Sequence, residues 1–148
     1  MENCVRTLEQ LGVPHDVRIL SAHRTPEALT TYMTESEANG AEVFIGAAGM
    51  AAHLAGVMAA QTAKPVLGVP MESKLQGIDS LLSMVQMPAG IPVATFAVGK
   101  AGAVNAALFA ASILAVEHPA IGQAVGSFRQ AQSDKVLGDP DPRQPAPI

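Results

Sequence analysis

Three side chains that can bind an anion or move a proton lie close together near the start of the chain. Ser21, His23 and Arg24 belong to the stretch SAHRTPE, residues 21–27. This stretch follows a predicted strand at 17–20 and precedes a predicted helix, which is where open α/β sheets bind ligands. Arg24 and the first helix amides suit a phosphate, and imidazole titrates near neutral pH, so His23 can transfer protons. A solvated turn capped locally by Ser21 explains the same residues, and the residues alone leave both interpretations open.

A second cluster is rich in small residues. The stretch GAAGMAAHLAG, residues 46–56, follows another predicted strand and contains His53. Small side chains let the backbone approach a ligand closely, and amides at a helix start can hold a carboxylate. His53 taken by itself is more typical of a hydrogen-bonded histidine in the core. The stretch does not satisfy GxGxxG, and the chain has no GxxxxGKS or GxxxxGKT phosphate loop.

The sequence motifs give little support to a metal-dependent reaction or to a serine hydrolase. His23 and His53 have no Cys or Asp at ligand spacing, and no HExxH occurs. There is also no GxSxG. A third cluster, residues 79–93, combines Gln86 with a turn rich in proline and glycine. A structural role, in which these residues only end a helix and form a loop, also explains this cluster. We therefore expect no metal.

The elements that must position these clusters alternate between helix and strand. Apolar spacing and Gly and Pro stops predict strands at 17–20, 42–46, 65–70 and 92–98, and helices at 2–11, 26–38, from about 50, 78–86, 101–116 and 119–136. Thr25 is the expected N-cap and Pro26 the first residue of the second helix. This alternation predicts an α/β fold with a parallel sheet and helices on both faces.

The first element is out of place for such a sheet. The chain opens on a helix, whereas a doubly wound sheet normally opens on a strand that becomes central. If the place of that central strand were left empty, two inner strand edges would be exposed.

Composition limits the partners of the chain. Its 148 residues suit one domain, and charged residues make up 15%, below the roughly 25% of a soluble domain, so we expect oligomerisation to cover part of the surface. A net charge of −4 gives no basic stripe for nucleic acid. The single Cys4 predicts a cytoplasmic protein and a packing role for that side chain. No signal peptide is recognisable, and the uncharged helix at 101–116 is too short for a membrane span.

Several motifs together resemble one family. SAHRTPE, AAHLAG, PVLGVP, the run GIDSLLSMVQMPAGIPVATFAVGKAGAVNAALFAASILA and the late DPDP are similar in order and spacing to the 5-(carboxyamino)imidazole ribonucleotide mutase family of purine biosynthesis. The resemblance covers nearly everything from residue 2 to 143. It implies a flavodoxin-like, three-layer α/β/α domain, here residues 1–137 with a Pro-rich tail at 138–148, assembled as an octamer.

The resemblance also implies a reaction and its residues. The carboxylate on the exocyclic nitrogen of the ribonucleotide substrate moves to the neighbouring ring carbon without any cofactor, by a lyase-like decarboxylation and recarboxylation. His23 is then the catalytic proton shuttle, and Ser21 and Arg24 match phosphate-binding positions. The pocket for the migrating carboxylate or carbon dioxide matches Ala48, Gly49, His53 and Leu54. A small, dry pocket suits this role because free carbon dioxide would escape to solvent.

The chain departs from the family pattern in two places. In the second loop Ala47 and Met50 replace glycines and Ala55 replaces a proline, so we expect Met50 to narrow the pocket. At the front, the family's first strand and Gly-Ser-x-Ser-Asp loop are not found, and a truncated or late-started sequence is the simplest hypothesis. Two alternatives remain: a direct carboxylase of aminoimidazole ribonucleotide that uses free carbon dioxide, and an N-terminally incomplete, noncatalytic assembly.

Overall fold

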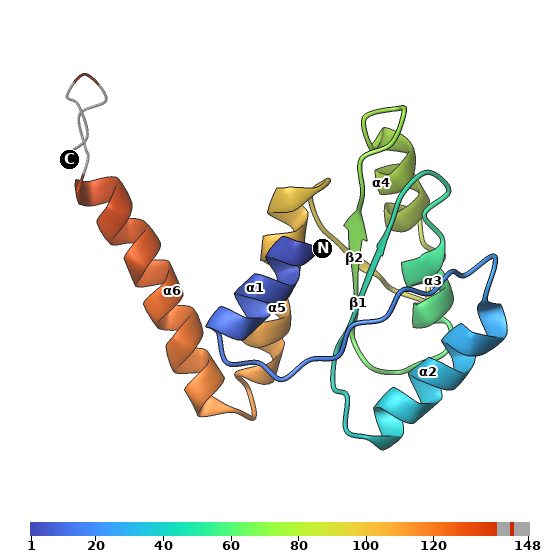
Figure 1. Cartoon of the computed structure of the whole chain (residues 1–148), viewed down its shortest axis with the longest axis horizontal. Coiled ribbons are helices and arrows are strands. Elements are labelled where there is room, and N and C mark those ends of the chain that lie inside the picture. The colour runs from blue at the N-terminus through green and yellow to red at the C-terminus, as the bar shows by residue number, and fades with distance from the viewer. Residues whose placement is uncertain (139–142, 144–148) are drawn as a thin grey trace.

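The computed structural model describes residues 1–138 and Arg143 as an α/β fold (Figure 1). Three parallel strands, β1 (Phe44–Ala48), β2 (Val66–Pro70) and β3 (Ala94–Thr95), form a sheet in the order β1-β2-β3. The helices of the described part are α1 (Glu2–Gln10), α2 (Pro26–Ala38), α3 (Leu54–Ala59), α4 (Ile78–Val85), α5 (Lys100–Leu114) and α6 (Pro119–Gly138). The predicted α/β class with a parallel sheet is confirmed. Apart from Gly138 and Arg143, the tail expected at 138–148 lies outside the described residues.

Helices pack on both faces of the sheet (Figure 1). On one face α5 lies against β2 and α1 lies against α5, in a core that includes Leu8, Ala107 and Val69. On the other face α3 and α4 lie on the strands, and Leu29 and Met33 of α2 join the core there. Alternate residues of each strand therefore serve two different helix layers, which is the three-layer arrangement the sequence predicts.

Two glycines let the helices of one layer lie close to the sheet. A Cβ atom on Gly46 would lie 3.0 Å from Met58 Sδ and 3.2 Å from Ala55 Cα. A Cβ atom on Gly68 would lie 3.2 Å from Met84 Sδ. Because interiors are close-packed, this contact fixes α3 and the loop that precedes it against the end of β1.

The predicted strand at 17–20 is wrong, because the structure forms no strand there. Among residues 1–138, no backbone–backbone hydrogen bond involves Arg18–Leu20, and Ile19 is fully exposed. A strand forms only against the edge of another strand, and β1, the edge strand of the sheet, is separated from residues 17–20 by a hollow that both line. The space between residues 17–20 and β1 is therefore open in this structure.

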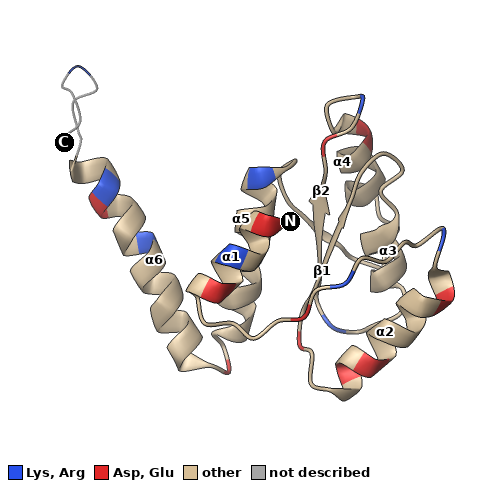
Figure 2. Cartoon of the chain, in the orientation of Figure 1, with Lys and Arg blue, Asp and Glu red and all other residues tan. Residues whose placement is uncertain are grey.

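Charge is unevenly distributed over the elements. Lys, Arg, Asp and Glu lie mainly on α1, α2, the loops and α6, whereas α3 has none and α5 has only Lys100 (Figure 2). From α5 the chain passes to α6, which extends away from the body of the molecule (Figure 1). None of the helices in residues 1–138 is both long enough and apolar enough to cross a membrane.

Candidate active site at the carboxyl edge of the sheet

Two histidines that are distant in the sequence form a direct contact. His23 Nε2 lies 3.0 Å from His53 Nδ1, and the ring centroids are 5.0 Å apart with the planes at 81°. One of these nitrogens carries the shared hydrogen and the other accepts it. Both side chains are exposed, so a ligand can reach either ring. The pair can therefore hold or pass a proton at the surface of the protein.

A hydrogen-bonded turn fixes the backbone around His23. Ser21 Oγ accepts hydrogen bonds from the amides of His23 and Arg24, at 3.3 and 3.2 Å. Thr25 Oγ1 accepts from the Ser21 amide at 2.8 Å and donates to the Ser21 carbonyl at 3.1 Å. Thr25 is the N-cap and Pro26 opens α2 as predicted, but the threonine hydroxyl bonds back to the turn instead of to helix amides. The local turn and the histidine contact are both present, so the two interpretations of this stretch are compatible.

The loop after β1 carries the second cluster. Ala48 ends the strand, Gly49 follows it, and His53 is the N-cap of α3, which begins at Leu54. The helix expected from about residue 50 thus begins later, because Met50 takes a left-handed backbone with φ 57° and turns the chain before the helix. The Met50 side chain is 62% exposed. These residues and the turn at 21–24 meet at the carboxyl edge of the sheet, where His53 contacts His23.

The segment after β2 was missed by the sequence reasoning. The Met71 amide donates to the Ala48 carbonyl at 2.9 Å, which ties this segment to the second cluster. Ser73 Oγ donates to the Asp79 carboxylate, and this hydrogen bond lowers the pKa of the Asp79 carboxyl below its ordinary value. The position of this segment in the sequence could have marked it as part of the site, because the segment follows the carboxyl end of a strand just as the other two clusters do.

The third cluster lies away from the histidines within the chain. Gln86 is the C-cap of α4, and the turn that follows leads to the amino end of β3, at the opposite edge of the sheet. Met87 in this turn packs beside α3, since a Cβ atom on Gly56 would lie 3.1 Å from its Sδ. Cys4 is also distant from the chemistry. It is buried, and burial raises the pKa of its thiol, in agreement with the packing role predicted for it.

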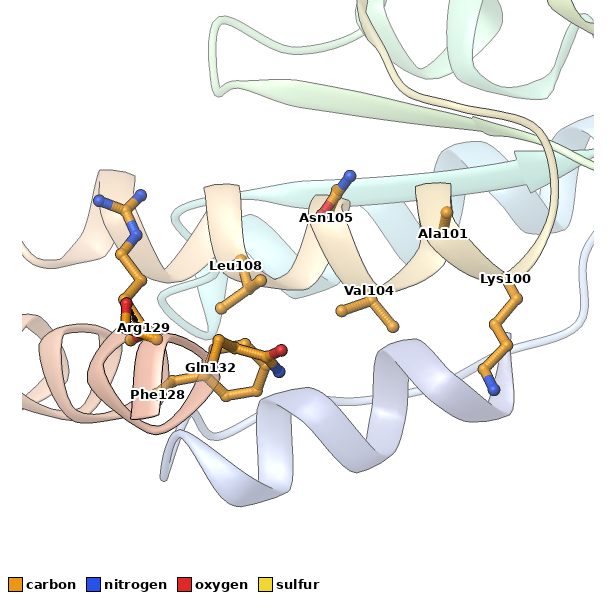
Figure 3. A pocket seen from close by; sticks show the side chains of 9 residues that line it. Lys100, Ala101, Val104, Asn105, Leu108, Phe128, Arg129 and Gln132 are labelled. Carbon is orange, nitrogen blue, oxygen red and sulfur yellow. Dashed lines mark hydrogen bonds between the residues drawn. The ribbon is translucent and has the colours of Figure 1, made fainter. Parts of the chain in front are cut away.

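Two hollows in the described part of the chain lie away from the histidine pair. One, of about 770 Å³, lies between α5 and α6 and is lined by apolar Val104, Leu108 and Phe128 (Figure 3). The other, of about 890 Å³, lies beside β1. Among the described residues, no group of three or more His, Cys, Asp or Glu side chains gathers as a metal site would require. We place the chemistry at the histidines, because their contact joins two titratable side chains from different segments at the carboxyl edge of the sheet, where open α/β sheets bind ligands.

Comparison with known proteins shows the family to which the chain belongs. The family model described as AIR carboxylase matches residues 1–135. The chain belongs to this family. The predicted family resemblance is thereby confirmed.

Named relatives cover most of the chain. The N5-carboxyaminoimidazole ribonucleotide mutase of Pseudomonas aeruginosa is 58% identical over 137 residues, which cover 92% of this chain and 84% of the relative. The mutase of the same name from Escherichia coli K12 is 54% identical over 144 residues, covering 97% and 85%. A crystal structure of Treponema denticola PurE has a TM-score of 0.86 at 27% identity, covering 97% of this chain and 89% of that one. In this AIR carboxylase family member, the fold and the sequence therefore point to the same class of enzyme.

Proposed function

We propose that this AIR carboxylase family member is a mutase that converts 5-(carboxyamino)imidazole ribonucleotide to 4-carboxy-5-aminoimidazole ribonucleotide in purine biosynthesis. The relatives described above carry the name of this activity, at up to 58% identity. The observation that carries the proposal is the contact between His23 and His53 at the carboxyl edge of the sheet. It supplies a proton-handling group where the reaction needs one.

The reaction requires two proton movements. The bond between the exocyclic nitrogen and the carboxylate carbon breaks, carbon dioxide leaves, and the nitrogen gains a proton. The neighbouring ring carbon then bonds to the carbon dioxide and loses its own proton. We assign both transfers to His23, because general acid/base catalysis needs a titratable group within hydrogen-bond reach of the reacting atoms and His23 is exposed to a ligand. We assign His53 the positioning of the His23 ring through the 3.0 Å contact.

The remaining residues of the edge bind the substrate in this proposal. Ser21 and Arg24 hold the phosphate, since an exposed guanidinium beside a fixed turn suits a doubly charged group. Ala48, Gly49 and Leu54, together with His53, surround the migrating carboxylate. Their small or apolar side chains exclude water, which keeps carbon dioxide in place between the two steps.

We also propose the setting in which the chain acts. It works in the cytoplasm as one domain, residues 1–137, and assembles into an octamer that requires no metal or cofactor. The assembly is supported by the few charged residues on α3 and α5 and by the apolar hollow between α5 and α6. Large apolar surfaces of a protein are normally covered by a partner. Nucleic acid has no role, since the net charge is −4.

The test is turnover of 5-(carboxyamino)imidazole ribonucleotide without added bicarbonate, followed by the ultraviolet absorbance of the product. We expect product above the nonenzymatic background, and a loss of about 10²- to 10⁴-fold in His23→Asn, the usual effect of removing a general acid/base. The control is His15→Asn, because His15 is exposed and its Nδ1 lies 2.9 Å from the Val13 carbonyl, apart from the histidine pair.

Each outcome decides between the functions considered. Background rates with the unsubstituted protein would favour the noncatalytic assembly, and turnover only after bicarbonate is added would favour the direct carboxylase. Near-normal turnover in His23→Asn would remove the assigned role of that side chain.

A further inference from the structure

Residues 71–77, which follow β2 and lead into α4 at the carboxyl edge of the sheet, are bonded back to the start of α4 (Figure 1). Ser73 Oγ donates a hydrogen bond to the Asp79 carboxylate, and Ser80 Oγ donates to the Met71 carbonyl at 2.8 Å. Ser80 has no exposed surface. A buried hydroxyl is costly unless it is hydrogen-bonded, so the Met71 carbonyl accounts for a serine at this position.

Two left-handed residues turn the chain so that these contacts can form. Gln76 has a φ of 55° and Gly77 a φ of 83°. Left-handed backbone is costly for a residue other than glycine, and it persists where the surrounding contacts fix it. A Cβ atom on Gly77 would lie 2.4 Å from Val98 Cγ1, so the turn packs closely against the segment that precedes α5. The turn between β2 and α4 is therefore held in one place.

The same segment contacts the loop after β1. The Met71 amide donates to the Ala48 carbonyl at 2.9 Å, so the backbone of Met71 is bonded to Ser80 at its carbonyl and to Ala48 at its amide. A Cβ atom on Gly49 would lie 3.6 Å from the Glu72 carbonyl oxygen and 3.7 Å from Met71 Cβ. The segment after β2 therefore packs directly on the backbone of Ala48 and Gly49.

The polar side chains at the start of α4 do more than begin the helix. The N-cap, Gly77, supplies no side-chain cap, and Asp79 and Ser80 bond to residues outside the helix. Ser83 Oγ, one turn further along, lies 3.4 Å from the Met50 carbonyl. The start of α4 thus connects the segment after β2 with the loop after β1.

We propose that Asp79 and Ser80 are positioning residues that keep carbon dioxide in the site between the two steps of the reaction. Through residues 71–77 they fix the backbone of Ala48 and Gly49, which surround the migrating carboxylate in the proposed function, so the inference rests on that function. A fixed wall keeps carbon dioxide beside the ring carbon, whereas a loosened wall admits solvent. Carbon dioxide that escapes leaves aminoimidazole ribonucleotide, whose nitrogen has already gained its proton, as a second product.

The test measures how the substrate is divided between these two products. 5-(Carboxyamino)imidazole ribonucleotide is supplied without bicarbonate, and both products are quantified by chromatography at early times, after subtraction of nonenzymatic decarboxylation. We expect Asp79→Ala and Ser80→Ala to raise the ratio of aminoimidazole ribonucleotide to carboxylated product at least about fivefold, the factor that corresponds to one lost hydrogen bond. Asp79→Asn should stay near the parent ratio, because its amide oxygen can still accept from the Ser73 hydroxyl.

Two further variants complete the experiment. Ser73→Ala removes the partner of Asp79 and should change the ratio as Asp79→Ala does. Asp134→Ala is the matched control, because Asp134 also accepts a side-chain hydrogen bond, from Gln130 at 2.8 Å, but lies exposed on α6. It should leave the ratio unchanged. If the buried Ser80→Ala variant does not fold, the variants of Ser73 and Asp79, which are only partly buried, decide the question.

Two results would overturn the inference while leaving the proposed function in place. The first is a parent ratio of products in Asp79→Ala and Ser73→Ala. The second is a lower rate in these variants with an unchanged ratio, because the contacts would then support the fold without retaining carbon dioxide. Background rates with the parent protein would instead reject the proposed function, and this inference with it.

Discussion

At the scale of single residues, the feature that matters most is a contact between two histidines from different segments. The sequence identified His23 and His53 separately, but nothing in their spacing could pair them, because the contact depends on the position of the turn before α2 relative to the loop after β1. His53 by itself pointed to a buried core residue, whereas the structure exposes it at the N-cap of α3. Their joint place in one site came from the family resemblance alone.

The contact predicts different effects for two substitutions of His53. An Asn side chain can present an amide near the place of Nδ1, which lies 3.0 Å from His23 Nε2, whereas Ala offers no partner. We expect His53→Ala to lower kcat about 10- to 100-fold, less than the 10²- to 10⁴-fold typical of removing the general acid/base itself, and His53→Asn to recover much of that loss.

The readout for this pair is the pH dependence of kcat/KM. A positioning role requires the Ala variant to shift the profile and the Asn variant to restore it toward that of the parent protein. An unchanged profile and an unchanged rate in His53→Ala would argue against any coupling between the two rings.

At the scale of elements, local signals located the helices well and the strands less well. Thr25 and Pro26 mark the start of α2, which the structure begins at Pro26. The last predicted strand, 92–98, shrinks to Ala94–Thr95, and the strand at 17–20 is absent. Helices make their own hydrogen bonds, whereas a strand depends on a partner elsewhere in the chain, which apolar patterning does not reveal.

Gly102 makes a testable contact between α5 and the segment before it. A Cβ atom on Gly102 would lie 1.7 Å from the Ala97 carbonyl oxygen. This overlap can be relieved only if the backbone of α5 or of the segment before it moves. We expect Gly102→Ala to lower the free energy of unfolding by about 3 kcal/mol or more, as measured by urea denaturation.

The matched control lies on α6. A Cβ atom on Gly126 would meet no neighbouring group within 4 Å, so Gly126→Ala should raise the stability by about 0.5–1 kcal/mol through helix propensity alone. Equal stability in the two variants would mean that α5 does not pack against Ala97 as described.

At the scale of the whole molecule, the low fraction of charged residues predicted that oligomerisation covers part of the surface. The structure shows where apolar side chains of the helices are exposed. Val136 and Leu137 at the end of α6 are 71% and 72% exposed, and the hollow between α5 and α6 is lined by Val104, Leu108 and Phe128 (Figure 3). The composition could indicate that other copies of the chain cover exposed apolar surface. It could not identify which helix faces are left open, because that depends on how α6 leaves the body of the protein (Figure 1).

The proposed assembly predicts a change in mass when α6 is charged. Val136→Glu combined with Leu137→Glu should shift the protein from the octamer to smaller species in sedimentation velocity, because buried unpaired carboxylates are costly. The double change Gln123→Glu and Ser127→Glu adds the same charge at exposed polar positions of α6 and should leave the mass unchanged. Parent protein that sediments as a monomer would contradict the assembly itself.

In the proposed reaction, one carboxylate moves within one substrate molecule at the histidine pair. The most direct measurement supplies 5-(carboxyamino)imidazole ribonucleotide with a carbon-13 carboxylate to the protein in unlabelled bicarbonate and determines the label in the product by mass spectrometry. We expect the product to retain the label, because in the proposed reaction the carbon dioxide stays between Ala48, Gly49 and Leu54 until it is bonded to the ring carbon. Product that carries the unlabelled carbon of the bicarbonate would contradict a mutase and identify a carboxylase instead.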